Sequence, residues 1–125
     1  MPLYRCSSPA SALDDDKRLK VVESITEIHC TITGAPRSFV HVFFFDEEEG
    51  SSHKISGSIR SGRDEEKREL LHSQMTEAYS EIAGVSSDQV SVMTTNFPAK
   101  WTMEHGAVLP EPGEEAEWVA AHSNH

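Results

Sequence analysis

The chain has 125 residues, enough for one ordinary domain with a buried core. Hydrophobic residues make up 37% and charged residues 26%, which is typical of a globular protein and excludes a disordered one. The net charge of −10 argues against nucleic acid as a partner, because the average surface repels phosphates. It still permits a small anionic substrate, provided that basic side chains are concentrated locally.

The composition also argues against a membrane protein and against metal chemistry. No segment approaches the roughly 18 consecutive apolar residues that cross a membrane, and the start lacks the apolar stretch of a signal peptide. We therefore expect a cytoplasmic protein. Cys6 and Cys30 suit neither a disulfide framework nor a zinc site, so both are expected to be free thiols. The histidines show no metal-ligand spacing, so neither a metal nor a cofactor is expected.

In chain order, alternating apolar and polar segments predict six elements. They are strands at 3–6, 39–45, about 54–59 and 89–95, and helices at about 11–32 and 63–83. Ser11 and Asp14 have the spacing of a capping box at the start of the first helix. A charged turn at 46–52 separates the two halves. After Phe97 the tail is interrupted by prolines, and little regular structure is expected there.

The two helices carry an internal repeat. Each has an apolar stripe with steps of 4, 3 and 4 residues, and the second stripe follows the first after 50 residues: Val21, Ile25, Ile28 and Ile32 match Leu71, Met75, Ala78 and Ile82. The helix-ending glycines Gly34 and Gly84 keep the same offset. Shared helix ends favour a duplication, and the alternative is chance similarity between two amphipathic helices.

The repeat defines the expected fold. Each half reads as strand, helix and strand, so the expected class is α/β (α+β). The tandem βαβ repeats lie at about 2–46 and 52–96, and a tail follows at 97–125. Together they form a single domain. Right-handed crossovers then give a four-stranded sheet with two helices on one face. Because segment 39–45 is apolar at nearly every position, the other face is apolar as well. A second copy of the chain is its economical cover, so we expect a homo-oligomer.

Pro2 is the first candidate catalytic residue. If Met1 is removed, Pro2 carries a secondary amine at the end of the chain, and burial or nearby cations lower the pKa of such an amine. It can then act as a general base or attack a carbonyl group. Pro2 also leads directly into the first strand, which would hold it in place. The alternative is an ordinary proline at a loose terminus.

Four more residues are candidates for the site. Arg60 and Arg63 lie where the second helix is expected to begin, and two guanidinium groups can clamp a carboxylate. Their alternative is surface pairing with the acidic residues at 64–66. His29 lies one step off the apolar stripe of the first helix. The alternative to a role in the site is a purely structural one. Glu104 follows a proline-broken turn, and a solvated glutamate is its alternative.

An ordered set of short motifs resembles the tautomerase superfamily, and most closely its cis-3-chloroacrylic acid dehalogenase group. The set runs from residue 1 to about 118 and comprises Met-Pro-Leu-Tyr at the start, Glu27-Ile28-His29, Thr33-Gly34, Arg60-Ser61-Gly62-Arg63, Phe97-Pro98-Ala99, Met103-Glu104-His105-Gly106, Leu109-Pro110-Glu111-Pro112-Gly113 and Glu117-Trp118. The resemblance implies a homotrimer with a catalytic amino-terminal proline and a small anionic carboxylate as substrate.

The resemblance also implies a role for each site residue. Pro2 is the catalytic amine, Arg60 and Arg63 bind the substrate carboxylate, His29 assists that binding, and Glu104 positions or activates a water molecule. We expect Met93 and Trp101 to line the pocket.

One of these pocket residues departs from the family pattern. Met93 stands where the family has a tyrosine that helps the glutamate, and a thioether can neither donate a proton nor orient water. We therefore rank keto–enol tautomerisation of a 2-oxo acid first. Dehalogenation or hydration of a cis-3-haloacrylate-like acid comes second, and decarboxylation of a 3-oxo acid third. A carboxylate-binding oligomer without catalysis is the remaining alternative.

Overall fold

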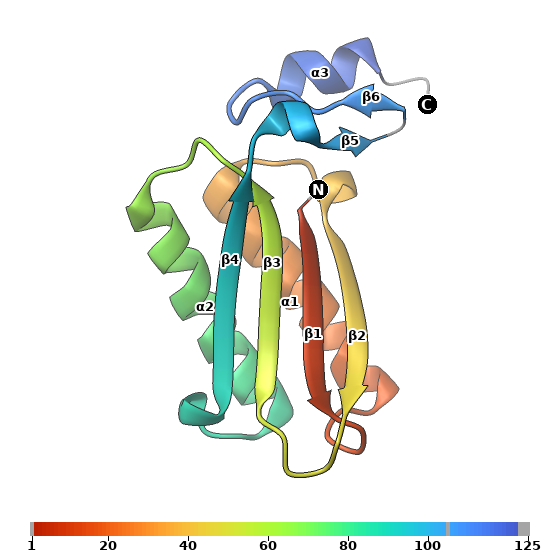
Figure 1. Ribbon diagram of the computed structural model, residues 1–125, viewed down its shortest axis with the longest axis vertical. Helices are drawn as coiled ribbons and strands as arrows, with labels where there is room; N and C mark the ends of the chain where they lie inside the picture. The colour runs from red at the N-terminus through yellow and green to blue at the C-terminus, as the bar shows by residue number, and fades with distance from the viewer. Residues whose placement is uncertain (1, 105, 123–125) are drawn as a thin grey trace.

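The computed structural model describes residues 2–104 and 106–122. Its main sheet has the strand order β2–β1–β3–β4, and two helices cover one face (Figure 1). In chain order the elements of this layer are β1 (Leu3–Pro9), α1 (Asp15–Thr33), β2 (His41–Glu47), β3 (His53–Arg60), α2 (Glu65–Ala83) and β4 (Val90–Phe97). β1 is parallel to β2, β3 is parallel to β4, and β1 is antiparallel to β3. The predicted fold of two βαβ units in a four-stranded sheet is confirmed.

Both helices begin later than the sequence pattern predicts. Asp14, and not Ser11, is the N-cap of α1, and its Oδ1 accepts a hydrogen bond from the backbone N–H of Lys17 at 2.8 Å. Ser11 instead donates its hydroxyl to Glu49 at 2.8 Å. The predicted capping box is therefore wrong. Asp64 caps α2 in the same way as Asp14 caps α1, because an extended residue with a short carboxylate satisfies the free N–H groups at a helix start.

The helix ends follow the repeat. α1 and α2 both have 19 residues, and both end at a glycine in the left-handed conformation, with φ of 78° at Gly34 and 72° at Gly84. This conformation is strained for residues with a Cβ atom, so the matched glycines fix where each helix stops. No helix in the described part of the chain is long and apolar enough to cross a membrane.

The core lies between the sheet and the two helices. Its buried residues include Tyr4, Cys6, Ile55 and Ile59 from the strands and Val21, Ile25, Leu71, Met75 and Tyr79 from the helices. Val42 and Phe44 of β2 pack against this core, whereas Phe43 and Phe45, which alternate with them, are exposed on the outer face of the sheet. The prediction of an apolar outer face holds for this edge strand but not for the central strands, because Arg5, Lys54 and Ser56 there are exposed polar residues.

The tail is more regular than the sequence pattern predicts. It contains a short 3-10 turn (Ala99–Trp101), the hairpin β5 (Met103–Glu104) and β6 (Ala107–Val108), and helix α3 (Glu115–Ala121). Trp118 fastens α3 to the rest of the tail, because its indole N–H donates to the carbonyl of Val108 at 2.7 Å. The indole ring also packs edge to face against the ring of Phe39, with the ring centroids 5.3 Å apart. Prolines therefore shape the path of the tail here without preventing structure.

Candidate active site

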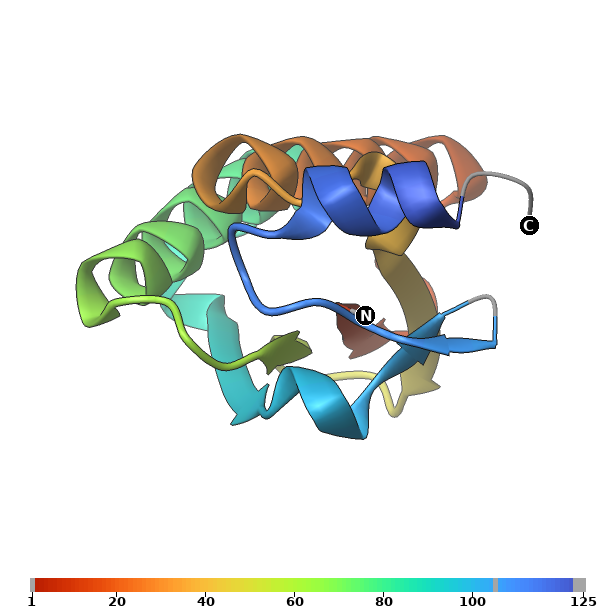
Figure 2. The same cartoon turned by 90° about the horizontal axis from the view of Figure 1, so that it is seen from above.

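Four of the predicted site residues lie at one end of the sheet under the tail, and a fifth, Glu104, lies in the tail itself. Pro2 precedes β1, Arg60 ends β3, and Arg63 lies between β3 and α2. His29 is in the last turns of α1, and Glu104 belongs to β5. Because β1 and β3 are antiparallel, the start of one lies beside the end of the other. Seen from above, the tail passes over this end of the sheet, close to the start of β1 (Figure 2).

Pro2 is held by the sheet. Its side chain is fully buried, and its carbonyl accepts a hydrogen bond from the backbone N–H of His41 at 2.9 Å. This bond extends the β1–β2 pairing one step beyond Leu3. Pro2 is therefore not part of a loose terminus. Met1, whose removal the amine hypothesis requires, lies outside the described residues.

His29 is a buried, uncharged imidazole. Its Nδ1 lies 2.7 Å from the hydroxyl of Tyr4, and its Nε2 is buried without a hydrogen-bond partner among the described residues. Burial, reinforced by the charges of Arg63 and Arg60, lowers the pKa of His29 to about 3. Burial also raises the pKa of Tyr4, so this hydroxyl keeps its proton. When Tyr4 donates to Nδ1, the imidazole proton is on Nε2 and is available to an acceptor.

The lowered pKa of His29 predicts a loss of stability in acid. An unfolded chain protonates this histidine near pH ~6.5, whereas the folded chain does so only near pH 3. Between these values the unfolded state binds more protons, so the free energy of unfolding falls as the pH falls. We expect His29→Asn to reduce this slope by up to about 1.4 kcal/mol per pH unit. Urea unfolding of both proteins between pH 4 and 7 measures it; equal slopes would contradict the assignment.

Arg60 is buried with both of its terminal nitrogens in use. Nη1 donates to the carbonyl of Pro110 at 2.6 Å, and Nη2 donates to Oε1 of Glu115 at 3.1 Å. The guanidinium also lies 5.4 Å from the centre of the Phe39 ring. Its Nε is buried and has no partner among the described residues. The alternative of surface pairing with residues 64–66 is therefore wrong for Arg60, which binds a carboxylate of the tail.

Arg63 has more side-chain nitrogens without a partner among the described residues than Arg60 has. Its Nη1 donates to the carbonyl of Arg60 at 2.8 Å, while Nε and Nη2 are buried without a partner among the described residues. Arg63 precedes Asp64, the N-cap of α2, so the prediction that it begins the helix is wrong. Burial and the charge of Arg60 lower the pKa of Arg63, against the opposing effect of Glu115. An anion beside Arg63 would relieve this uncompensated positive charge.

Glu104 is hydrogen-bonded to a histidine that sequence reasoning missed. Its Oε1 lies 2.9 Å from Nε2 of His41, at the start of β2. Partial burial raises the pKa of Glu104, but hydrogen bonding and nearby positive charge, including His41, lower it more, so the net pKa is below its usual value. Glu104 is therefore a carboxylate at neutral pH. The only local sign of His41 was a polar residue between Val40 and Val42 in an apolar strand.

Met93 and Trp101 are the most exposed of the predicted site residues. Met93 is 65% exposed on the outer face of β4, and Trp101 is 70% exposed in the turn after β4. A pocket role for these side chains stays a prediction. Since the outer face of the sheet is directed away from the helices, Met93 would need a neighbouring copy of the chain to enclose it.

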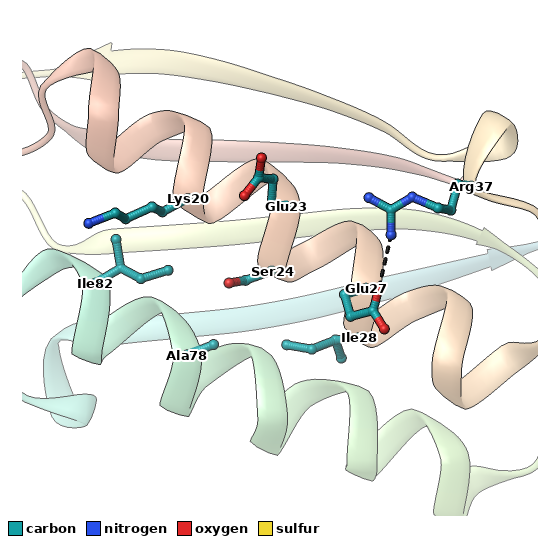
Figure 3. A pocket seen from close by; sticks show the side chains of 8 residues that line it. All are labelled: Lys20, Glu23, Ser24, Glu27, Ile28, Arg37, Ala78 and Ile82. Carbon is teal, nitrogen blue, oxygen red and sulfur yellow. Dashed lines mark hydrogen bonds and ion pairs between the residues drawn. The ribbon is translucent and has the colours of Figure 1, made fainter.

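A shallow groove elsewhere on the molecule is not the candidate site. It lies between α1 and α2, with the sheet behind it, and an ion pair of 2.9 Å joins Arg37 to Glu27 at one side (Figure 3). Its lining is Lys20, Glu23, Ser24, Glu27, Ile28, Arg37, Ala78 and Ile82. None of the predicted site residues is among them. The groove has none of the buried, unpaired donors that mark the end of the sheet.

These unpaired donors define what the site can bind. Six buried side-chain nitrogens lack a partner among the described residues, and four of them belong to His29, Arg60 and Arg63. A buried donor without an acceptor costs free energy, so a ligand that supplied acceptors here would be stabilised. A carboxylate has two oxygens and about four lone pairs, which is enough to accept from all four of these N–H groups. The site fits a small organic anion.

Comparisons with known proteins show which proteins this chain is similar to in sequence and fold. The family described as "Putative oxalocrotonate tautomerase enzyme" matches residues 1–61. The crystal structure of N1, a member of the cis-3-chloroacrylic acid dehalogenase family, is 32% identical with a TM-score of 0.91, over 95% of this chain and 91% of that one. Native Ps01740 is 37% identical with a TM-score of 0.79, over 82% and 100%.

Solved structures of lower sequence identity share the same fold. A fused 4-OT asymmetric trimer has a TM-score of 0.74 at 19% identity, over 86% of this chain and 95% of that one, which shows the shared fold alone. No curated protein sequence matches the chain. The fold, together with the family match and the similarity to N1, defines a tautomerase-type protein. The chain belongs to the tautomerase superfamily and, within it, to the cis-3-chloroacrylic acid dehalogenase-like group.

Proposed function

We propose that this protein is a cofactor-independent enzyme that catalyses keto–enol tautomerisation of a small 2-oxo acid. The observation that carries the proposal is the group of buried donors from His29, Arg60 and Arg63, unpaired among the described residues, at the end of the sheet where Pro2 precedes β1. Removal of Met1 would give Pro2 a secondary amine. Burial and the neighbouring guanidinium charges favour the uncharged form of that amine, which is the form that a general base requires.

The proposed reaction needs only proton transfer. Arg63 and the free Nε of Arg60 bind the substrate carboxylate, and Nε2–H of His29 donates to the same anion. In the enol-to-keto direction, the Pro2 amine removes the enol O–H proton and the same proton is then delivered to the substrate carbon. One O–H bond and the C=C π bond are lost, and one C–H bond and the C=O π bond are formed. No oxidant or reductant takes part.

A second function, hydration or dehalogenation of a cis-3-haloacrylate-like acid, is supported by the hydrogen bond between Glu104 and His41. Glu104 would accept a proton from a water molecule while the oxygen of that water attacks one alkene carbon. A protonated Pro2 would give a proton to the other alkene carbon. Loss of hydrogen halide from the product then yields an aldehyde. His41 would orient the carboxylate of Glu104. It would thereby take over part of the role of the family tyrosine, which Met93 replaces in this chain. The similar protein N1 belongs to a family named for a dehalogenase.

The proposed assembly is a homotrimer. On the outer face of the sheet, cross-strand pairing aligns Phe43 with Arg5, Arg5 with Ser56, and Ser56 with Met93. Phe43 is 53% and Met93 65% exposed, which leaves apolar surface for another copy to cover. The fused 4-OT protein of similar fold is a trimer. Light scattering should give three times the chain mass, and a monomer at micromolar concentration would contradict the proposal.

The decisive experiment compares three substrates and the pH dependence of turnover. Phenylpyruvate, 2-hydroxymuconate and cis-3-chloroacrylate are assayed side by side after mass spectrometry has established whether Met1 is absent. Tautomerase activity that rises with pH through the titration of the amine supports Pro2 as a base. Activity on cis-3-chloroacrylate that falls over the same range supports the second function. A retained Met1 or an acylated terminus would rule out both, and carboxylate binding without turnover would indicate the non-catalytic alternative.

A further inference from the structure

We infer that Glu115 sets the charge of the carboxylate site and thereby selects substrates with one carboxylate over substrates with two. The inference deepens the proposed function and depends on it in one respect, since it takes Arg60 and Arg63 as the anion-binding groups. The resemblance to known proteins assigned no role to Glu115. The role follows from its position at the start of α3, against Arg60.

Both oxygens of Glu115 are fixed. Oε1 accepts from Nη2 of Arg60 at 3.1 Å, and Oε2 accepts from the backbone N–H of Gly113 at 2.8 Å. Glu115 is only 7% exposed, although it lies in a helix turn whose other acids, Glu114 and Glu117, are exposed. A buried carboxylate beside a buried guanidinium interacts strongly, because water screens the pair little. Its carboxylate therefore acts directly on the guanidinium of Arg60.

Before Glu104 is counted, the charges at the site add up to one unit. Arg60 and Arg63 contribute two positive charges, Glu115 contributes one negative charge, and His29 is neutral at pH 7. The effect of Glu115 extends to Arg63, because it opposes the influence of Arg60 on that side chain. A proline amine acting as a base adds no charge. Among Arg60, Arg63, Glu115 and His29 this leaves one unit of positive charge; the carboxylate of Glu104 on the tail is not part of this sum and reduces the total further.

This balance favours a monoanion. A single substrate carboxylate neutralises the remaining unit, whereas a second carboxylate would be buried without a counter-charge, which is costly. Glu104, ionised on the tail above the same end of the sheet, adds repulsion against a second carboxylate. Neutralising Glu115 would leave two units of positive charge and would make the site better suited to a dianion.

The test compares Glu115→Gln with Glu117→Gln. Both variants remove one negative charge from α3, but Glu117 is exposed and serves as the matched control. With phenylpyruvate as monoanion and 2-hydroxymuconate as dianion, we expect the dianion-to-monoanion ratio of kcat/KM to rise about tenfold or more in Glu115→Gln. Glu117→Gln should leave the ratio unchanged. An unchanged ratio in Glu115→Gln, or an equal rise in Glu117→Gln, would overturn the inference.

A binding measurement separates this inference from the proposed function. Propionate and succinate are titrated at pH 8 and constant ionic strength, with changes in NMR shifts as the readout. The wild-type protein should bind propionate more tightly, and Glu115→Gln should reverse the order. A reversal without turnover on any substrate would sustain the inference while the enzyme proposal fails. Wild-type protein that binds succinate as tightly as propionate, or binds neither, overturns it even if Glu115→Gln does not fold.

Discussion

Replacing Pro2 with alanine is expected to lower kcat by about a hundredfold or more, because the proposed proton transfer depends on this amine. The fold should persist, since the carbonyl of residue 2 still accepts from the backbone N–H of His41. Pro9→Ala is the matched control, because Pro9 is also a buried proline of β1 but lies at the opposite end of the strand. Steady-state kinetics measure turnover, and urea unfolding measures stability.

Two outcomes would contradict the role of Pro2. Wild-type turnover in Pro2→Ala, with Met1 shown to be absent, would exclude the proline amine as the catalytic base. An unfolded Pro2→Ala protein beside a folded Pro9→Ala protein would instead indicate a structural role for the buried ring. Mass spectrometry of each variant is part of the experiment, because only a free terminus can carry the amine.

Arg60→Ala is expected to cost about 3–5 kcal/mol of stability as well as activity, because it leaves the carboxylate of Glu115 buried without a cation. It also removes the donor to Pro110, so two points of attachment of the tail are lost. Arg63→Ala should act differently. Its Nε and Nη2 have no partner among the described residues, and only the hydrogen bond from Nη1 to the carbonyl of Arg60 is lost. We therefore expect a loss of stability of about 1 kcal/mol, while KM for a 2-oxo acid rises about tenfold or more.

Urea unfolding and steady-state kinetics on both arginine variants distinguish these effects. The double variant Arg60→Ala/Glu115→Ala should recover part of the stability lost in Arg60→Ala, because it removes the unpaired charge as well. Equal losses of stability in Arg60→Ala and Arg63→Ala would refute the division of labour between a tail anchor and an anion donor. The same conclusion would follow if Arg60→Ala changed only KM.

Much of the fold was predictable from local patterns. The stripe of Val21 and Ile25, repeated at Leu71 and Met75, reports which face of each helix is buried, because helical periodicity is a property of neighbouring residues. Gly34 and Gly84 likewise mark both helix ends. The exact helix starts were not predictable, because the spacing of a capping box does not determine which acidic or hydroxyl residue reaches the free N–H groups.

The candidate site was predictable only in part. Residue type and order indicated Pro2, His29, Arg60 and Arg63, and the structure brings them to one end of the sheet. The prediction took Arg60 to be a free clamp, whereas its terminal nitrogens are bound to the tail. The sequence could not show this, because it does not reveal that α3 forms or where it packs.

By itself, the sequence determined the tandem βαβ order, the buried helix faces, the apolar residues of β2 and the placement of a proline next to the first strand. These features depend on periodicity and on residues close together in the chain. Only the tertiary structure decided that Arg60 is paired with Glu115, 55 residues away, and His41 with Glu104, 63 residues away. Both pairs form because the tail folds over the end of the sheet. No local sequence pattern predicts contacts between residues so far apart in the chain.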